Sequence, residues 1–97
     1  MAKILYEINY KIYPEKRADY LEAISDLKEL VPAELNYQVF ENAKNSNDFT
    51  EIFMCESEDE YENFEDNQDD KVREITEKLI NELVIDKKIS FTTKNEL

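Results

Sequence analysis

The sequence of 97 residues predicts an α+β fold of the ferredoxin-like kind, a single domain over residues 1–97 in which helices cover one face of a four-stranded antiparallel sheet. Three observations lead to this prediction. Four stretches alternate apolar and polar residues, which is the period of a half-buried strand. Two longer stretches repeat apolar residues at helical spacing. Their order, strand, helix, strand, strand, helix, strand, is the split βαβ arrangement.

The first predicted strand covers residues 4–12, where the alternation is strict. One side carries five large apolar or aromatic residues: Ile4, Tyr6, Ile8, Tyr10 and Ile12. The opposite side carries Leu5, Glu7, Asn9 and Lys11. The apolar side must be covered by other elements, because its exposure to water would be unfavourable. We therefore expect any polar chemistry on the opposite side.

A helix is predicted over residues 14–31, since Pro14 suits the first turn of a helix and Pro32 ends it. Residues 35–41 alternate again and predict a second strand. The run that follows is rich in Asn and Asp, which is typical of the connection in a β-hairpin. A third strand is therefore expected over residues 49–56.

Ser57 and Glu60 form a capping-box pattern, which predicts that a short helix begins directly after the third strand. Apolar residues at helical spacing then predict a longer helix over residues 72–83. Residues 86–88 predict a turn, and residues 89–94 alternate in a last strand.

The alternation assigns each strand residue to one of two faces of the sheet. The face under the helices is expected to carry Ile4, Tyr6, Ile8, Tyr10, Tyr37, Val39, Ile52, Met54 and Phe91. The bare face is expected to carry Leu5, Glu7, Asn9, Gln38, Phe40, Phe53, Cys55, Ser90 and Thr92. Leu5, Phe40 and Phe53 give this face more bulky apolar surface than an open sheet face usually exposes. We therefore expect a second copy of the chain to pack there, forming a homodimer.

Composition excludes several classes of function. A net charge of −12 disfavours binding to nucleic acid and to anionic membranes. The absence of histidine removes the commonest general base and metal ligand, and the absence of glycine removes Gly-rich phosphate loops. No metal and no cofactor is expected. Cys55 is the single cysteine, and residues 1–12 form no continuous apolar segment, so we expect a cytoplasmic protein.

Two short segments add to the order of elements. Residues 14–16 read Pro-Glu-Lys at a strand–helix junction, and residues 56–61 read Glu-Ser-Glu-Asp-Glu-Tyr where the third strand meets the short helix. In these features the sequence resembles the dimeric α+β barrel superfamily, and within it the antibiotic-biosynthesis-monooxygenase-like proteins. Their corresponding segments are Pro-Gly-Lys and Glu-Ser-Glu-Glu followed by an aromatic residue. The resemblance covers nearly the whole chain.

This resemblance implies that two protomers pair their sheets into a barrel. It also implies that a small organic ligand binds between sheet and helices or inside the barrel. Members of the superfamily include oxygenases that use neither metal nor flavin, and haem-degrading enzymes. The chain departs from them, since Cys55 stands where relatives often carry tryptophan and the histidine of many catalytic members is absent. Asn9 is a loose counterpart of the first-strand asparagine of the haem-degrading members.

Glu7 and Asn9 are the candidate catalytic residues, because they project from one face two positions apart and could bind or deprotonate a polar ligand. The expected ligand pocket is lined by Phe40, Phe53, Cys55 and Thr92. The alternative for Glu7 is an ion pair across the sheet with Lys11, Lys88 or Lys94. Cys55 is expected to act as an apolar filler, since no histidine can activate it as a nucleophile.

Tyrosines at positions 6, 10, 20 and 37 could stabilise an oxyanion, but their positions favour a role in the core. Two functional hypotheses follow. In the first, the homodimer binds a small apolar or aromatic molecule and acts as a cofactor-independent monooxygenase-like enzyme, with Glu7 and Asn9 at the substrate. In the second, the homodimer is a non-catalytic ligand carrier or interaction module. Its partners are itself and a small organic ligand, with no nucleic acid and no membrane.

Overall fold

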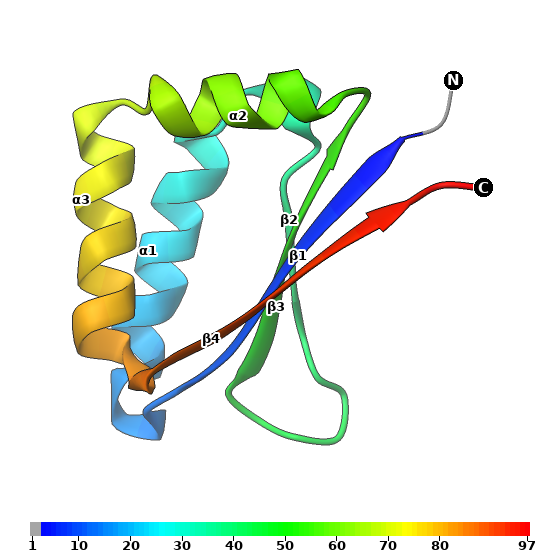
Figure 1. The fold of residues 1–97 in the computed structure, drawn as a ribbon. Helices are drawn as coiled ribbons and strands as arrows, with labels where there is room; N and C mark the ends of the chain where they lie inside the picture. The colour runs from blue at the N-terminus through cyan, green and yellow to red at the C-terminus, as the bar shows by residue number, and fades with distance from the viewer. Residues whose placement is uncertain (1–2) are drawn as a thin grey trace.

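The computed structural model describes residues 3–97 and contains one antiparallel sheet with helices on one of its faces (Figure 1). The elements in chain order are β1 (Ile4–Ile12), α1 (Arg17–Leu30), β2 (Gln38–Glu41), β3 (Asp48–Cys55), α2 (Glu58–Asp66), α3 (Asp70–Lys78) and β4 (Val84–Asn95). Short 3-10 turns cover Pro14–Lys16 and Ala33–Leu35, and a π-helical turn covers Leu79–Leu83. The predicted α+β fold class is confirmed.

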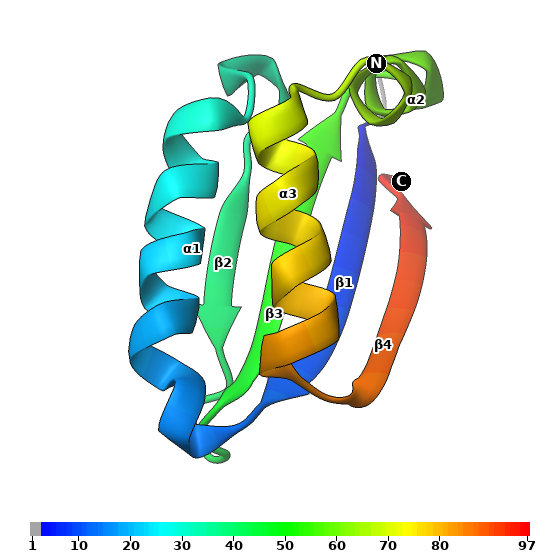
Figure 2. The ribbon, with the colours of Figure 1, turned by 90° about the vertical axis from the view of Figure 1, so that its left-hand side faces the viewer.

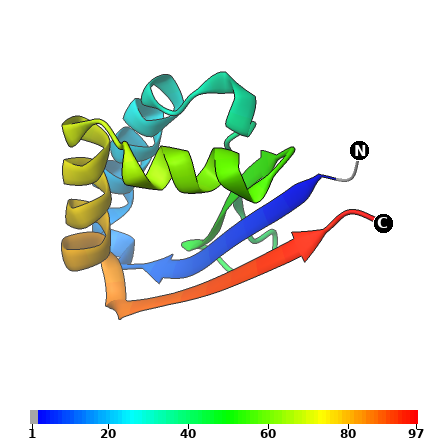
Figure 3. The ribbon, with the colours of Figure 1, turned by 45° about the horizontal axis from the view of Figure 1, so that its top comes forward.

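The strands lie in the order β2-β3-β1-β4, and every neighbouring pair is antiparallel. The first strand of the chain is therefore central, as the split βαβ arrangement requires. Figure 2 shows α1 and α3 side by side over the same face of the sheet. Figure 3 shows α2 lying across one end of that face, so three helices cover the same side of the sheet.

Two core clusters lie between the sheet and the helices. The larger one joins β1 and β3 to α1, α3 and the π-helical turn, and its buried members include Tyr10, Tyr20, Leu27, Phe49 and Leu79. The smaller one lies under α2, and its buried members are Tyr6, Val31, Leu35, Phe53, Cys55 and Tyr61. The second cluster is rich in aromatic residues, with the rings of Tyr6 and Tyr61 stacked at a centroid distance of 4.0 Å.

The second strand is shorter than predicted. Residues 33–35 form a 3-10 turn, and Asn36 has a left-handed backbone with φ of 49°. Asparagine tolerates this conformation better than most residues. Leu35 is buried as a strand residue would be, although it belongs to the turn.

The predicted cap of the short helix is confirmed. Ser57 is the N-cap of α2, and its Oγ accepts a hydrogen bond from the backbone N–H of Glu60. The carboxylate of Glu60 reaches back to the backbone N–H of Glu56 at 3.0 Å. The exchange differs from a regular capping box by one residue, because there the acidic side chain bonds the N–H of the cap itself.

The predicted turn at residues 86–88 lies inside β4 as a bulge. Tyr10 pairs with Ile89 and Ile12 pairs with Val84, so the β4 side of this pairing carries extra residues. Asp86 and Lys87 absorb the shift with left-handed backbones, each with φ of 56°. Because the chain has no glycine, residues with a Cβ must adopt a conformation that glycine adopts more easily.

The prediction for the two faces of β3 was wrong. Phe53 pairs with Tyr6 and Cys55 pairs with Ile4, so both lie under the helices. Ile52 and Met54 were expected there, but they pair with Glu7 and Leu5 on the opposite face. Directly opposed residues of an antiparallel pair share a face, so the register decides the assignment.

The sheet face opposite the helices still carries apolar surface after this correction. Leu5, Phe40, Ile52 and Met54 lie on it, among Glu7, Asn9, Gln38, Thr50, Ser90, Thr92 and Lys94. Phe40 is 53% exposed. We call this surface the open sheet face, since no helix of the described residues covers it (Figure 1).

Candidate functional site

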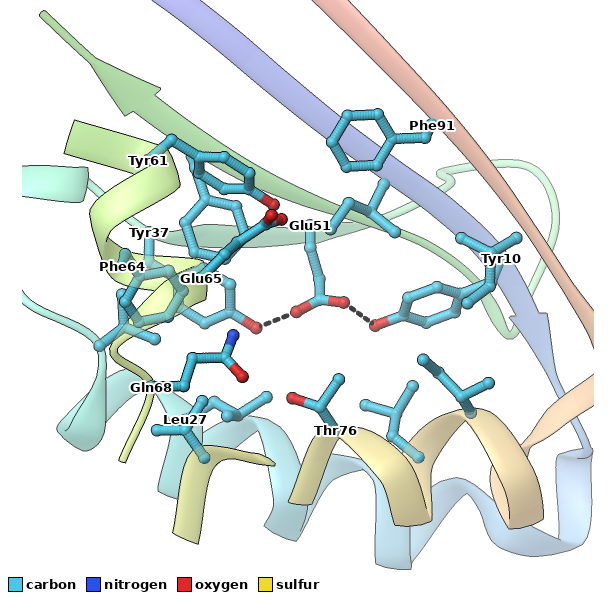
Figure 4. A pocket seen from close by; sticks show the side chains of 17 residues that line it. Tyr10, Leu27, Tyr37, Glu51, Tyr61, Phe64, Glu65, Gln68, Thr76 and Phe91 are labelled. Atoms are coloured by element: carbon cyan, nitrogen blue, oxygen red, sulfur yellow. Dashed lines mark hydrogen bonds between the residues drawn. The ribbon is translucent and has the colours of Figure 1, made fainter. Parts of the chain in front are cut away.

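A cavity of about 240 Å³ lies between the sheet and the helices. Its wall is built by β1, α1, β3, α2, α3 and β4 together, and it is mainly apolar. Aliphatic residues such as Ile8, Leu27 and Ile80 form much of the wall, and aromatic rings form the rest. Figure 4 shows one carboxylate in its interior, that of Glu51.

Glu51 faces the helices because of its place in β3. Phe49, Glu51, Phe53 and Cys55 follow each other at period two and are all buried. Three of the four are apolar, so the carboxylate lies within an apolar surface, where it is only 8% exposed. A buried carboxylate requires hydrogen-bond donors.

Two tyrosines supply these donors. The hydroxyl of Tyr10 donates to Oε2 of Glu51 at 2.8 Å, and the hydroxyl of Tyr37 donates to Oε1 (Figure 4). The Tyr10 hydroxyl also lies 2.8 Å from that of Tyr20. The result is a buried chain of three phenols and one carboxylate, drawn from β1, α1, β3 and the segment before β2.

Burial raises the pKa of Glu51 above its usual value, because loss of water disfavours the charged form. The two tyrosine hydrogen bonds act in the opposite direction. Burial also raises the pKa of Tyr10 and of Tyr37, and the nearby Glu51 raises both further. The phenols therefore stay protonated near neutral pH, and Glu51 is the group of this network that exchanges a proton most readily.

The hydrogen-bond chain accepts both protonation states of Glu51. When it is ionised, Tyr37 and Tyr10 donate to it and Tyr20 can donate to Tyr10, so every hydroxyl proton has an acceptor. When it is protonated, it can donate to the Tyr37 oxygen and thereby free the Tyr37 proton. Tyr37 lines the cavity, so a ligand can accept that proton there. The pair can thus take a proton from a ligand or give one to it.

One end of the cavity reaches the surface between α2 and β4. Phe91 of β4 lies there and is 53% exposed, and Glu65 of α2 is exposed beside the ring of Tyr61 (Figure 4). Burial raises the pKa of Tyr61, and Glu65 raises it further. We call Tyr61, Glu65 and Phe91 the cavity mouth.

Glu7 and Asn9, the predicted catalytic residues, lie on the open sheet face. Oε2 of Glu7 is 3.3 Å from Nζ of Lys94, which is one of the ion pairs named as the alternative. The side-chain amide of Asn9 donates to Oδ1 of Asp48 at 2.9 Å and to Oγ1 of Thr50 at 3.1 Å. Both groups therefore have partners on neighbouring strands, and their action on a ligand stays a prediction.

The predicted pocket residues do not form one group. Phe40 and Thr92 lie on the open sheet face with Glu7, and Thr92 pairs directly with it. Phe53 lies on the other face and lines the cavity with Glu51. Cys55 is also under the helices, where burial raises the pKa of its thiol. The structure thus divides the predicted set between the two faces of the sheet.

Glu51 was not among the site residues predicted from the sequence, although one signal was present. Phe49, Phe53 and Cys55 have the same parity in the strand, and Glu51 is the one charged residue in that series. Tyr10 and Tyr37 were expected as core residues. They are part of the core, but their hydroxyls also hold the carboxylate.

Two further observations concern the residues that the structure describes. Within residues 3–97, no group of three or more Cys, Asp or Glu side chains is placed to hold a metal ion. No helix in the same range is long and apolar enough to cross a membrane.

No known family model matches the sequence, and no curated protein matches it. Solved structures do match. A conserved protein from Methanosarcina mazei Go1 superposes with a TM-score of 0.83 at 19% identity, covering 100% of this chain and 95% of the other. An antibiotic-biosynthesis-monooxygenase-like protein from Nitrosomonas europaea superposes with a TM-score of 0.82 at 8% identity, covering 98% and 90%.

A third structure, a NIPSNAP family protein of unknown function from Agrobacterium tumefaciens, has a TM-score of 0.74 at 14% identity and covers 96% of this chain and 86% of the other. The chain has the antibiotic-biosynthesis-monooxygenase-like fold. This confirms the resemblance stated from the sequence at the level of the fold. At these identities the fold is what the chains share, and the activity must be argued from the site itself.

Proposed function

We propose that the protein is a homodimeric α+β barrel that binds a small apolar or aromatic ligand in the cavity between its sheet and helices. One observation carries the proposal: an apolar cavity with a carboxylate inside it, held by two tyrosine hydroxyls. A core without ligand would be more stable with an apolar side chain at position 51, because burying a carboxylate is unfavourable. A ligand that needs the carboxylate gives a reason for its presence.

The cavity limits the size of the ligand. Pockets for drug-sized molecules are roughly 300–1,000 Å³, and this cavity is smaller, at about 240 Å³. A ligand of one or two rings fits that space better than a long or branched molecule. Its apolar body would contact aliphatic side chains such as Ile8 and Leu27, and a polar group would reach Glu51 or Tyr37.

The open sheet face supports the homodimer. It combines Leu5, Phe40, Ile52 and Met54 with polar residues that have partners within the sheet. A second copy of this face would cover the apolar groups, and closed pairing of identical surfaces is the commonest form of protein oligomer. The similar fold of the antibiotic-biosynthesis-monooxygenase-like protein is in keeping with a barrel formed by two sheets.

Cofactor-independent oxygenase chemistry is the catalytic form of this proposal. Glu51 has the environment of a general base, since burial disfavours its charged form and raises its pKa above its usual value. It would accept the proton of a phenolic substrate through Tyr37, and the resulting phenolate reacts with O₂ more readily than the phenol. Glu7 and Asn9 remain the alternative catalytic pair, in a site between the two sheets. The non-catalytic alternative is a carrier that uses the same cavity.

The experiment combines calorimetric binding of naphthols and naphthohydroquinones with measurement of oxygen uptake. It compares wild type, Glu51→Gln, and the double variant Glu7→Gln with Asn9→Ala. Oxygen uptake that is lost only in Glu51→Gln supports catalysis in the cavity, and loss only in the double variant supports the site between the sheets. Binding without uptake supports the carrier. Absence of binding to every compound would overturn the proposed function.

A further inference from the structure

Glu51 has no positive partner among the residues that the structure describes. Its two oxygens accept hydrogen bonds from Tyr10 and Tyr37, which are neutral. Within residues 3–97, no lysine or arginine lines the cavity. The two ion pairs of these residues, Arg17 with Glu41 and Lys94 with Glu7, are elsewhere.

A buried carboxylate without a cation is incompletely stabilised. Buried charges in proteins are usually paired, since hydrogen bonds from neutral groups recover only part of the lost hydration. An ionised carboxylate can accept about four hydrogen bonds. Two donors therefore leave acceptor capacity on Glu51, whose carboxylate is in the cavity wall opposite Gln68 and Thr76 of the helix layer (Figure 4).

The residues at the cavity mouth also favour a positively charged ligand. Glu65 is exposed there, beside the aromatic rings of Tyr61 and Phe91. Glu58 and Glu62 of α2 lie next to this mouth, in a surface hollow that also contains no basic side chain among the described residues. The carboxylates and the net charge of −12 attract cations and repel anions, and aromatic faces bind ammonium groups.

We propose that the ligand of the cavity is a small apolar amine, bound as its ammonium ion with one or two rings in the apolar part and the ammonium group on Glu51. The proposal rests on the non-catalytic form of the proposed function, because it names the class of ligand that the same cavity accepts and places an ammonium ion where the catalytic form places a phenol. The ammonium group supplies the charge that Glu51 lacks and donates to its remaining lone pairs. Ion-paired hydrogen bonds of this kind are about twice as strong as neutral ones.

The test is a matched ligand series of one shape and three charges: 2-naphthylmethylamine, 2-naphthylmethanol and 2-naphthoate, titrated calorimetrically into the full chain at pH 7. We expect the amine to bind about tenfold more tightly than the alcohol, which is the difference between a charged and a neutral hydrogen-bonded pair. The naphthoate should bind least, because it meets Glu65 at the mouth and Glu51 inside.

Two variants test which carboxylate causes the tighter binding of the amine. Glu51→Gln keeps the shape and one acceptor oxygen, so the alcohol should retain its affinity while the advantage of the amine disappears. Glu65→Gln is the matched control at the mouth and should keep most of that advantage. The series on wild type is decisive by itself, should Glu51→Gln fold poorly.

Equal affinities of amine and alcohol in wild type would overturn the assignment while leaving the proposed function intact. A preference that survives in Glu51→Gln would overturn the pairing with Glu51. If none of the three compounds binds, this inference fails, and the proposed function is decided separately by the binding of naphthols and naphthohydroquinones.

Discussion

At the scale of single residues, Glu51 lowers the stability of the fold and provides a group inside the cavity that can exchange a proton. The buried carboxylate lies in an apolar layer, yet the hydroxyls around it give it hydrogen-bond partners in either protonation state. Such polar networks are stable only when each member has a partner. Stability and function at this position should therefore respond in opposite directions to the same substitution.

The first prediction concerns the pH dependence of stability. Folding raises the pKa of Glu51 above its usual value, so the contribution of this group to stability is full below the pKa of the unfolded chain and is lost as the pH rises through the folded pKa. We expect the melting temperature of Glu51→Gln to exceed that of wild type at pH 8, with a smaller difference at pH 4. Melting curves of both proteins from pH 4 to pH 9 measure this, and a constant difference would contradict it.

Tyr37→Phe gives the second prediction, and this substitution should lower stability. It removes one donor that favours the ionised carboxylate, so the pKa of Glu51 should rise further. The loss of a hydrogen bond to a buried charged group costs about 1 to 3 kcal/mol. We expect this loss in urea unfolding at pH 8 and a smaller one at pH 4. Tyr13→Phe, which alters a tyrosine outside the network, is the control.

Lys87 gives a third prediction, unrelated to the cavity. Its backbone φ of 56° places it in the left-handed region, which costs a residue with a Cβ roughly 1–2 kcal/mol. Lys87→Gly should therefore stabilise the fold by about 1 kcal/mol. Lys88→Gly is the matched control, since φ of Lys88 is not positive and glycine should destabilise the strand there. Urea unfolding of the two variants measures both effects, and stabilisation by Lys88→Gly alone would refute the argument.

At the scale of elements, the helix α2 is the part of the fold most directly linked to the cavity. Tyr61, Phe64 and Glu65 reach the cavity from this helix, and its start is fixed by the Ser57 cap. Helices of nine residues depend on their caps and on packing, because isolated short helices are marginal.

Removal of this cap is the fourth prediction. Ser57→Ala should lower the free energy of unfolding by about 1 kcal/mol. It should also weaken ligand binding, since a frayed α2 no longer holds the ring of Tyr61 at the mouth. Ser25→Ala, at an exposed position in α1, is the control; it should leave ligand binding unchanged and raise stability slightly, since alanine has the higher helix propensity. Equal effects of the two substitutions would contradict a role of the cap.

The same scale explains what could be predicted from the sequence. Strands and helices were predicted where one period dominates, as in residues 4–12 with their strict alternation. The two faces of β3 could not be assigned in this way. Ile52, Phe53, Met54 and Cys55 are all apolar, so the odd-numbered and the even-numbered positions both carry apolar residues. Only the pairing of Tyr6 with Phe53 settles which of them is under the helices.

The candidate site was less predictable than the fold, for a related reason. Tyr10 and Glu51 are 41 positions apart, and Tyr37 is 14 positions from Glu51. Their contact depends on the register of β1 against β3 and on the turn that places Tyr37, neither of which local periodicity specifies. Glu7 and Asn9 were easier to notice because they are two residues apart on one strand.

At the scale of the whole molecule, the two faces of one sheet serve different purposes in the proposed function. The helix side holds the cavity, and the open sheet face is the proposed contact between protomers. Phe40 is 53% exposed on that face, and Leu21 is 48% exposed on α1 at the outer surface. The two residues are similar in exposure and differ in the surface to which they belong, so they form a matched pair for the fifth prediction.

We expect wild type to sediment as a dimer at micromolar concentration and Phe40→Glu to sediment as a monomer. The introduced carboxylate would be buried without a partner at an interface of two identical acidic chains, and such a charge is strongly unfavourable. Leu21→Glu adds the same charge to the helix surface and should leave the dimer intact. Sedimentation of wild type as a monomer would refute the proposed contact, and dissociation by both variants would assign the effect to net charge.

The cavity lies on the other side of the sheet, so a monomeric Phe40→Glu should still bind the ligand if the cavity is the site, and should lose it if the ligand binds between the sheets beside Glu7.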